Sequence, residues 1–187
     1  MKVLVLLTGG CESTAYLCHA VEEGYEVDAL HVSMSNVSDQ EGQVSRLICD
    51  KLGVSYYEMK VDADDFFQYA TRTIRDTNYW IFAAVLAAGR MDYDEIWFGI
   101  HCDDNLPQVG EVQSIYNLAV KQLGGSDYPP LRAPLFNLSK QELYDSIRVD
   151  IKPELVYCQV DKLDPCGQCG KCEEWKQFVK GVDKKVQ

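Results

Sequence analysis

The chain has 187 residues, 47% of them hydrophobic, which is enough to bury one sizeable core and close to the usual size of a single domain. Its 29 acidic side chains outnumber 18 basic ones, giving a formal net charge of -11. This balance opposes attraction to nucleic-acid phosphates and favours a free small-molecule substrate. The apolar run at residues 1–7 stops at Thr8, short of a signal-peptide core or a membrane span. We therefore expect one soluble, cytoplasmic domain over residues 1–187.

Extended apolar runs alternate with segments of helical periodicity through the first hundred residues. The predicted strands cover residues 1–7, 27–34, 54–61 and 95–100. The predicted helices between them cover residues 13–23, 43–52 and 66–90. Strands that alternate with helices imply right-handed crossovers and a parallel sheet covered on both faces, with ligands at the carboxyl ends of the strands. The predicted fold class is a Rossmann-like α/β sheet.

The alternation of predicted strands and helices is less regular beyond residue 100. Residues 101–107 are predicted to form a loop at the ligand-binding edge, and residues 111–123 to form a helix. Ser139 begins another helix, because Glu142 follows it at capping-box spacing. The polar residues 181–187 are expected to form a frayed tail.

The segment Thr8-Gly9-Gly10-Cys11-Glu12-Ser13-Thr14 connects the first strand to the first helix, where backbone N–H groups and the helix dipole converge. Adjacent glycines let the backbone approach a phosphate, and the hydroxyls of Thr8, Ser13 and Thr14 can donate to its oxygens. No lysine follows, so neither the Walker A motif nor G-x-G-x-x-G fits. From spacing alone, the segment is either a phosphate-binding loop or a tight turn after a strand.

Four cysteines near the C-terminus have metal-ligand spacing. Cys166, Cys169 and Cys172 form two overlapping C-x-x-C pairs, and Cys158 lies eight residues upstream. Four thiolates satisfy tetrahedral Zn²⁺ in a closed site of the structural type. An iron-sulfur cluster uses the same donors and is the second interpretation of these cysteines. Unligated, reduced thiols are the third. We predict a small zinc-binding segment over residues 153–180.

The remaining cysteines are scattered and receive no ligand role. Cys18 and Cys49 lie on apolar helical faces, where a free cysteine acts as a small core residue. Cys11 stands at a predicted helix N-terminus, where thiol pKa values fall, but we assign it no catalytic role.

The glycine segment resembles the S-G-G-x-D-S loop of the PP-loop ATP pyrophosphatases, which have an adenine nucleotide alpha hydrolase-like fold. The resemblance implies that ATP binds with Mg²⁺, and that Glu12 and Ser13 are catalytic. It places ATP against Leu7, Thr8, Gly9, Gly10, Cys11, Glu12, Ser13 and Thr14. Thr8 replaces the family's serine and keeps the hydroxyl. Glu12 replaces the aspartate, and its carboxylate lies at the end of a longer side chain. A hard cation tolerates either carboxylate if the loop adjusts.

Together, the loop and the cysteine cluster resemble the 7-cyano-7-deazaguanine synthases of queuosine and archaeosine biosynthesis. Residues 81–100 are similar to that family's A-A-x-x-A…G-V segment, residues 133–143 to its T-P-L-x-x-L-x-K-x-E-I stretch, and residues 165–172 to its P-C-G-x-C-x-x-C. The resemblance implies ATP-dependent conversion of 7-carboxy-7-deazaguanine and ammonia to the nitrile through an acyl-adenylate, an amide and a second adenylation. It also implies a homodimer.

Two family segments differ in this chain. The family's P-G-R-N corresponds to Arg75-Asp76-Thr77-Asn78, which keeps the asparagine, and its G-Y-P-D-C-R substrate loop corresponds to residues 105–111, which keep only the proline. Asn78 and Asp103 are the candidate substrate contacts, although Asp103 also fits a solvated acidic loop. His101 fits a surface hydrogen-bond donor better than a residue that polarises the substrate.

Three functional hypotheses follow from these motifs. The first is the ligase described above, with a variant that stops at the 7-amido product. The second is another PP-loop enzyme, such as a tRNA thiolation enzyme, which the acidic composition disfavours because such enzymes use a basic RNA surface. The third is a non-catalytic nucleotide-binding zinc module, motivated by Glu12 and the altered substrate loop. We favour the ligase.

Overall fold

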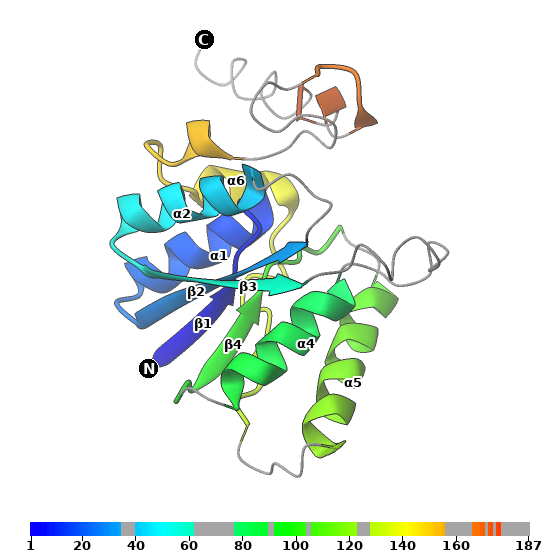
Figure 1. The fold of residues 1–187 in the computed structure, drawn as a ribbon. Helices are drawn as coiled ribbons and strands as arrows, with labels where there is room; N and C mark the ends of the chain where they lie inside the picture. Colours follow the sequence, from blue (N-terminus) through cyan, green and yellow to red (C-terminus); the bar gives the residue numbers. More distant parts are fainter. Residues whose placement is uncertain are drawn as a thin grey trace.

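A computed structural model of the chain contains one parallel sheet between two layers of helices (Figure 1). It describes residues 1–34, 40–61, 77–89, 92–103, 106–122, 128–155, 166–170, 172–173 and 175–176. The strands are β1 (Lys2–Leu6), β2 (Glu26–Met34), β3 (Ser55–Val61), β4 (Glu95–Phe98) and β5 (Leu131–Arg132). They pair in parallel in the order β3-β2-β1-β4-β5. The predicted Rossmann-like fold class is therefore confirmed.

Helices cover both faces of the sheet. They are α1 (Cys11–Glu22), α2 (Gln40–Leu52), α4 (Thr77–Ala88), α5 (Leu106–Gln122), α6 (Lys140–Ser146) and the short 3-10 helix η1 (Lys152–Glu154). Helices α1, α2 and α6 lie on one face, and α4 and α5 on the other (Figure 1). Because successive side chains of a strand point to opposite faces, Val3 and Val5 of β1 join the first core, and Leu4 and Leu6 join the second.

Two elements differ from the sequence-based prediction. Helix α5 begins at Leu106, so much of the segment aligned with the family's substrate loop is helical and not a loop. Pro107 suggested a loop, but proline is tolerated in the first turn of a helix, where its missing N–H group would have no partner anyway. Strand β5 was not predicted, because two residues after a pair of prolines carry no periodic signal. Residues 66–76 of the predicted long helix lie outside the described part.

The strand order reverses direction between β1 and β4. The chain runs outward from β1 to β2 and β3, and then returns to place β4 on the other side of β1. The connections leave the carboxyl ends of β1 and β4 in opposite directions, and α/β proteins bind ligands at such a switch point. The glycine segment follows β1, and His101 and Asp103 follow β4. Topology therefore brings both predicted groups to one place.

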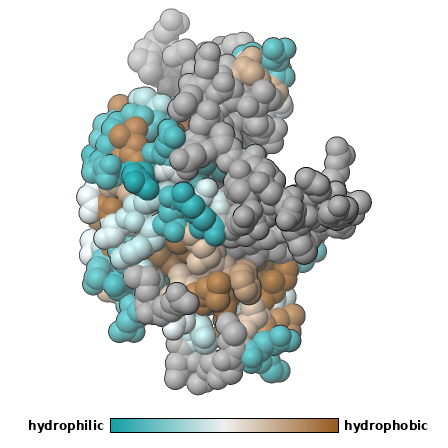
Figure 2. Space-filling view, viewed as in Figure 1, coloured by the Kyte–Doolittle hydropathy of each residue, from teal (hydrophilic) through white to brown (hydrophobic). Residues whose placement is uncertain are grey.

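The surface over α4 and α5 is apolar (Figure 2). Four large side chains of these helices are exposed there: Phe82, Leu86, Ile115 and Leu118. Within the described ranges, none of the helices is both long and apolar enough to cross a membrane.

Candidate active site and metal centre

The glycine segment forms a turn, and contacts to the Leu7 carbonyl oxygen hold the start of this turn. The Leu7 carbonyl oxygen lies 2.9 Å from Nδ1 of buried His31 and accepts a longer 3.5 Å hydrogen bond from the Ser45 hydroxyl of α2. Gly9 has φ of +74°, a left-handed conformation that favours glycine. A Cβ atom at Gly9 would lie 3.2 Å from a methyl carbon of Val44. The packing of α2 against the turn therefore restricts this position to glycine.

Gly10 has ordinary extended dihedrals and caps the N-terminus of α1. The Ser13 hydroxyl accepts a 3.1 Å hydrogen bond from the Thr8 N–H and lies 3.0 Å from the Thr8 hydroxyl. Two predicted phosphate-binding hydroxyls are thus held together at the helix N-terminus. Thr14 is fully buried, and its hydroxyl has no hydrogen-bond partner among the described atoms.

Glu12 is the centre of a charged cluster beside this turn. Its Oε1 atom lies 3.1 Å from the Lys140 ammonium and 3.6 Å from Nε2 of His101. The side chains of Lys140 and His101 are only 12% and 10% exposed, whereas that of Glu12 is 25% exposed. Two basic groups from distant parts of the chain therefore meet the one carboxylate of the loop, in a site that is largely shielded from water.

Backbone contacts hold the three segments of this cluster together. The Tyr16 hydroxyl of α1 donates a 2.8 Å hydrogen bond to the Ile100 carbonyl, which fixes the chain just before His101. The Cys102 N–H donates to the Leu138 carbonyl at 3.1 Å, just before α6. Asp103 accepts a 3.4 Å hydrogen bond from the Lys140 N–H, and its carboxylate lies 3.7 Å from Nδ1 of His101. The loop after β4 thus connects α1 to the start of α6.

The structure changes the interpretation of two residues. His101 was predicted to be a surface donor, but it is 8% exposed and lies between the carboxylates of Glu12 and Asp103, so that prediction is wrong. The sequence interpretation assigned no role to Lys140, although it occupies the lysine of the T-P-L-x-x-L-x-K-x-E-I resemblance, which was the available signal. Asn78 lies in the first turn of α4. Asp103 is exposed, as a solvated acidic loop would be.

The predicted capping box at the start of α6 is present. The Ser139 hydroxyl accepts from the Glu142 N–H, and the Glu142 carboxylate accepts from the Ser139 N–H at 2.8 Å. Hydrogen bonds from the Ser139 hydroxyl and N–H hold the pKa of Glu142 below its usual range. Because Lys140 is the next residue after this cap, the box positions its ammonium group beside Glu12.

We expect Ser139→Ala to lower the free energy of unfolding by about 1 kcal/mol at neutral pH, the usual cost of losing such a cap. The folded pKa of Glu142 is lowered, so its contribution is present above the pKa of the unfolded chain and disappears as pH falls through the folded value. Urea unfolding at neutral and at acidic pH tests this. A Ser139→Ala cost that does not shrink in acid would contradict the argument, and Glu142→Gln is the matched control for the carboxylate.

Three of the four predicted metal ligands converge. The sulfur atoms of Cys166, Cys169 and Cys172 lie within 4.8 Å of one another, and those of Cys166 and Cys172 are 4.0 Å apart. Two thiolates at about 2.3 Å from one tetrahedral ion would be about 3.8 Å apart, so the donors suit a single ion. In a [4Fe-4S] cluster, by contrast, each cysteine binds a different iron and the cysteine sulfurs are farther apart. Cys158 lies outside the described residues, as do most of residues 153–180 and all of 181–187.

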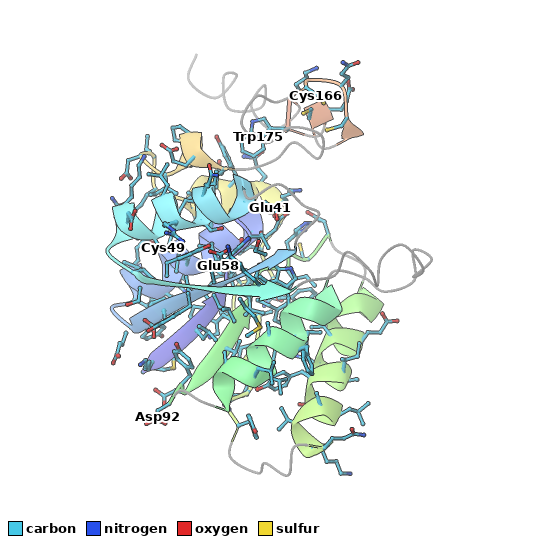
Figure 3. All side chains as sticks on the ribbon, in the orientation of Figure 1. Glu41, Cys49, Glu58, Asp92, Cys166 and Trp175 are labelled. Carbon is cyan, nitrogen blue, oxygen red and sulfur yellow. The ribbon has the colours of Figure 1, made fainter. Side chains whose placement is uncertain are left out.

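An aromatic contact docks the cysteine segment on the main body. Trp175 lies between the Cys166 region and α6 (Figure 3), and its ring meets Tyr144 of α6 edge to face at 5.3 Å between centroids. The cysteine segment therefore contacts, through Trp175, the same short helix that begins with Lys140. Cys18 and Cys49 are buried, as predicted, and burial raises the pKa of the Cys49 thiol to about 12.

Comparison with known proteins agrees with the predicted resemblance. The sequence model described as queuosine biosynthesis protein QueC matches residues 2–78. A 7-cyano-7-deazaguanine synthase from Campylobacter hominis is 24% identical over 220 residues, which covers 99% of this chain and 97% of the relative. Other proteins named 7-cyano-7-deazaguanine synthase match at 21% to 25% identity.

Solved structures support the fold. A 4-thiouridine synthetase in complex with RNA and ATP superposes with a TM-score of 0.57 at 14% identity, covering 97% of this chain and 50% of that one. A U34-tRNA thiolase from Methanococcus maripaludis with its [4Fe-4S] cluster has a TM-score of 0.54 at 15% identity, covering 99% of this chain and 67% of that one. At these identities the likeness shows the fold alone. The resemblance predicted from the motifs is found again in the sequence comparisons: over nearly its whole length, this chain is similar to proteins named 7-cyano-7-deazaguanine synthase.

Proposed function

We propose that this protein is an ATP-dependent ligase that converts 7-carboxy-7-deazaguanine and ammonia to 7-cyano-7-deazaguanine. The observation that carries the proposal is the meeting of Glu12, Lys140 and His101 beside the Thr8 and Ser13 hydroxyls, at the carboxyl ends of β1 and β4. The sequence relationship covers nearly the whole chain and points to the same reaction.

In the proposed reaction, a substrate carboxylate oxygen attacks the α-phosphorus of ATP, and pyrophosphate leaves. Ammonia then attacks the activated carbonyl carbon and displaces AMP, giving the amide. The amide oxygen is adenylated by a second ATP, again with loss of pyrophosphate. Loss of AMP and of both N–H protons then leaves the nitrile. Each activation is needed because a carboxylate or amide oxygen is a poor leaving group until it carries a phosphoryl group.

The loop residues Leu7 to Thr14 would hold ATP in this reaction. The N-terminus of α1 and the Thr8 and Ser13 hydroxyls would face the phosphates, and the Lys140 ammonium would add positive charge where negative charge develops on the departing pyrophosphate. Such preorganised donors act strongly in a site shielded from water. Asn78 and Asp103 are the proposed contacts to the base.

Two metal ions belong to the proposal. Mg²⁺, when bound with ATP, shares the negative charge of the phosphates, and Glu12 is the carboxylate that would hold it. Zn²⁺ would be held by Cys158, Cys166, Cys169 and Cys172, and a four-thiolate site has a structural role only. The exposed apolar side chains over α4 and α5 offer a surface for the homodimer that the resemblance implies (Figure 2).

Incubating the purified protein with 7-carboxy-7-deazaguanine, ammonium, Mg²⁺ and ATP tests the function. We expect AMP, pyrophosphate and the nitrile, identified by mass spectrometry, and loss of turnover in Ser13→Ala. Accumulation of the 7-amido product without nitrile would instead support an enzyme that stops after the first amination. No product under these conditions, with folded protein and bound ATP, would overturn the proposal.

A tRNA thiolation enzyme is the second candidate, because thiolases share the fold. The net charge of -11 opposes RNA binding, so we expect no tRNA binding at low salt. A non-catalytic module is the third, and it predicts that neither the natural protein nor Glu12→Asp turns over. Measurable turnover in the natural protein would exclude it.

A further inference from the structure

We propose that His101 is a positioning residue that acts through Glu12: with Lys140, it holds the loop carboxylate at the point where Mg²⁺ and ATP bind. This inference rests on the proposed function, since it assigns a role within the same site. It goes beyond the motifs, because nothing in the sequence distinguished His101 from a surface histidine.

The first support is geometric. Nε2 of His101 and the ammonium of Lys140 approach the same oxygen, Oε1 of Glu12, at 3.6 Å and 3.1 Å. The 3.6 Å separation is longer than a hydrogen bond, and contacts of this kind often shorten to hydrogen-bond distance when a ligand binds. His101 and Lys140 are far apart in sequence and approach from the loop after β4 and from the start of α6. Glu12 is therefore held from two separate elements.

The second support is the rigidity of the imidazole. His101 is 8% exposed, and its other ring nitrogen lies 3.7 Å from the Asp103 carboxylate, which also accepts from the Lys140 N–H. Ile100, the residue before His101, is held by the Tyr16 hydroxyl, which donates a 2.8 Å hydrogen bond to the Ile100 carbonyl. A side chain held on both sides in a shielded site can orient its neighbour without reaching the ligand itself.

The third support is the length of the Glu12 side chain. A glutamate carries one more methylene than the aspartate of the related loop, so its carboxylate has more rotamers to lose on ordering. A carboxylate that must meet a cation at a defined position benefits from neighbours that restrict it. His101 and Lys140 supply that restriction here.

A double-mutant cycle on MgATP affinity tests the inference, because this readout needs no deazaguanine substrate. Calorimetry would compare the natural chain, His101→Ala, Glu12→Gln and the double variant. We expect His101→Ala to weaken MgATP binding about tenfold in the natural chain. In the Glu12→Gln background, the same change should weaken binding less than about twofold, because the effects of coupled residues are not additive. His101→Gln, which keeps an N–H donor at nearly the same reach, is expected to recover most of the affinity.

Thermal unfolding of each variant separates a local effect from misfolding. The matched control is His19→Asn, which removes a histidine of α1 that stacks on Trp97 at 5.9 Å, away from the loop, and should leave MgATP affinity unchanged. An equal effect of His101→Ala in both backgrounds would overturn the positioning role and indicate direct contact with ATP. MgATP binding with no deazaguanine product would overturn the proposed reaction alone. Absence of MgATP binding in the natural chain would overturn both.

Discussion

Replacing Gly99 with alanine is expected to destabilise the protein and to abolish MgATP binding. A Cβ atom at Gly99 would lie 2.5 Å from the Ser13 backbone nitrogen, 2.7 Å from the Ser13 Cα and 2.8 Å from the Glu12 carbonyl carbon. All three contacts are with backbone atoms, which cannot move aside as a side chain would. The end of β4 and the first turn of α1 would have to separate.

The expected cost is about 3 kcal/mol in the free energy of unfolding, at the upper end for overpacked interiors. The separation would also move Glu12 and Ser13 away from Lys140 and His101, so ATP affinity should fall even at temperatures where the variant is folded. Urea unfolding measures the first effect, and calorimetry with MgATP measures the second.

Gly110→Ala is the matched control for Gly99→Ala. Gly110 lies in α5, and no described atom lies within 4 Å of a Cβ built there. Alanine should therefore be neutral or stabilise the helix by up to about 1 kcal/mol. If Gly99→Ala unfolded at the same urea concentration as the natural chain, the close approach of β4 to the glycine turn would be wrong.

Loss of the metal is the second large effect that we expect. Serine at Cys166, Cys169 or Cys172 removes one thiolate from the converging sulfurs, and Cys158→Ser tests the ligand that the described residues do not include. Each change should reduce zinc content from about one ion per chain to a small fraction of that, because a structural site needs its full set of ligands.

The stability of the cysteine segment should decrease in parallel. Metal binding and folding are coupled in small zinc segments, so removing the ion should loosen the contact of Trp175 with Tyr144. Quenching or a spectral shift of tryptophan fluorescence on chelation would report this. The unfolding midpoint should fall in the same variants.

Cys102→Ser is the matched control, because this thiol is exposed and far from the cluster in sequence. It should leave the metal content unchanged. Metal analysis that finds iron with inorganic sulfide, together with broad visible absorption, would contradict zinc and favour an iron-sulfur cluster. Full zinc content in Cys169→Ser would contradict the assigned ligands.

Local patterns in the sequence were sufficient for most of the fold. Hydrophobic periodicity located β1 to β4, because strands buried on both faces must be apolar throughout, and it located α1, α2 and α6 through their apolar faces and caps. It did not locate the start of α5, where Pro107 is compatible with both a loop and the first turn of a helix. Two-residue β5 is too short to carry a period.

The candidate site likewise combines residues that the sequence identified with residues that it did not. Its glycine turn and its cysteine cluster are contiguous motifs. Spacing singled out the turn and the C-terminal thiols, and the family resemblance singled out Glu12 and Ser13 within the turn. His101 is a single residue with no local signal, and Lys140 was marked only by its place in the family-like stretch of residues 133–143. They are joined to Glu12 only because the parallel sheet places β4 beside β1 and because α6 packs against α1. The sequence by itself determined the candidate loop and the candidate cysteine cluster, because each is a contiguous motif, and the tertiary structure alone decided which distant side chains lie beside the loop carboxylate.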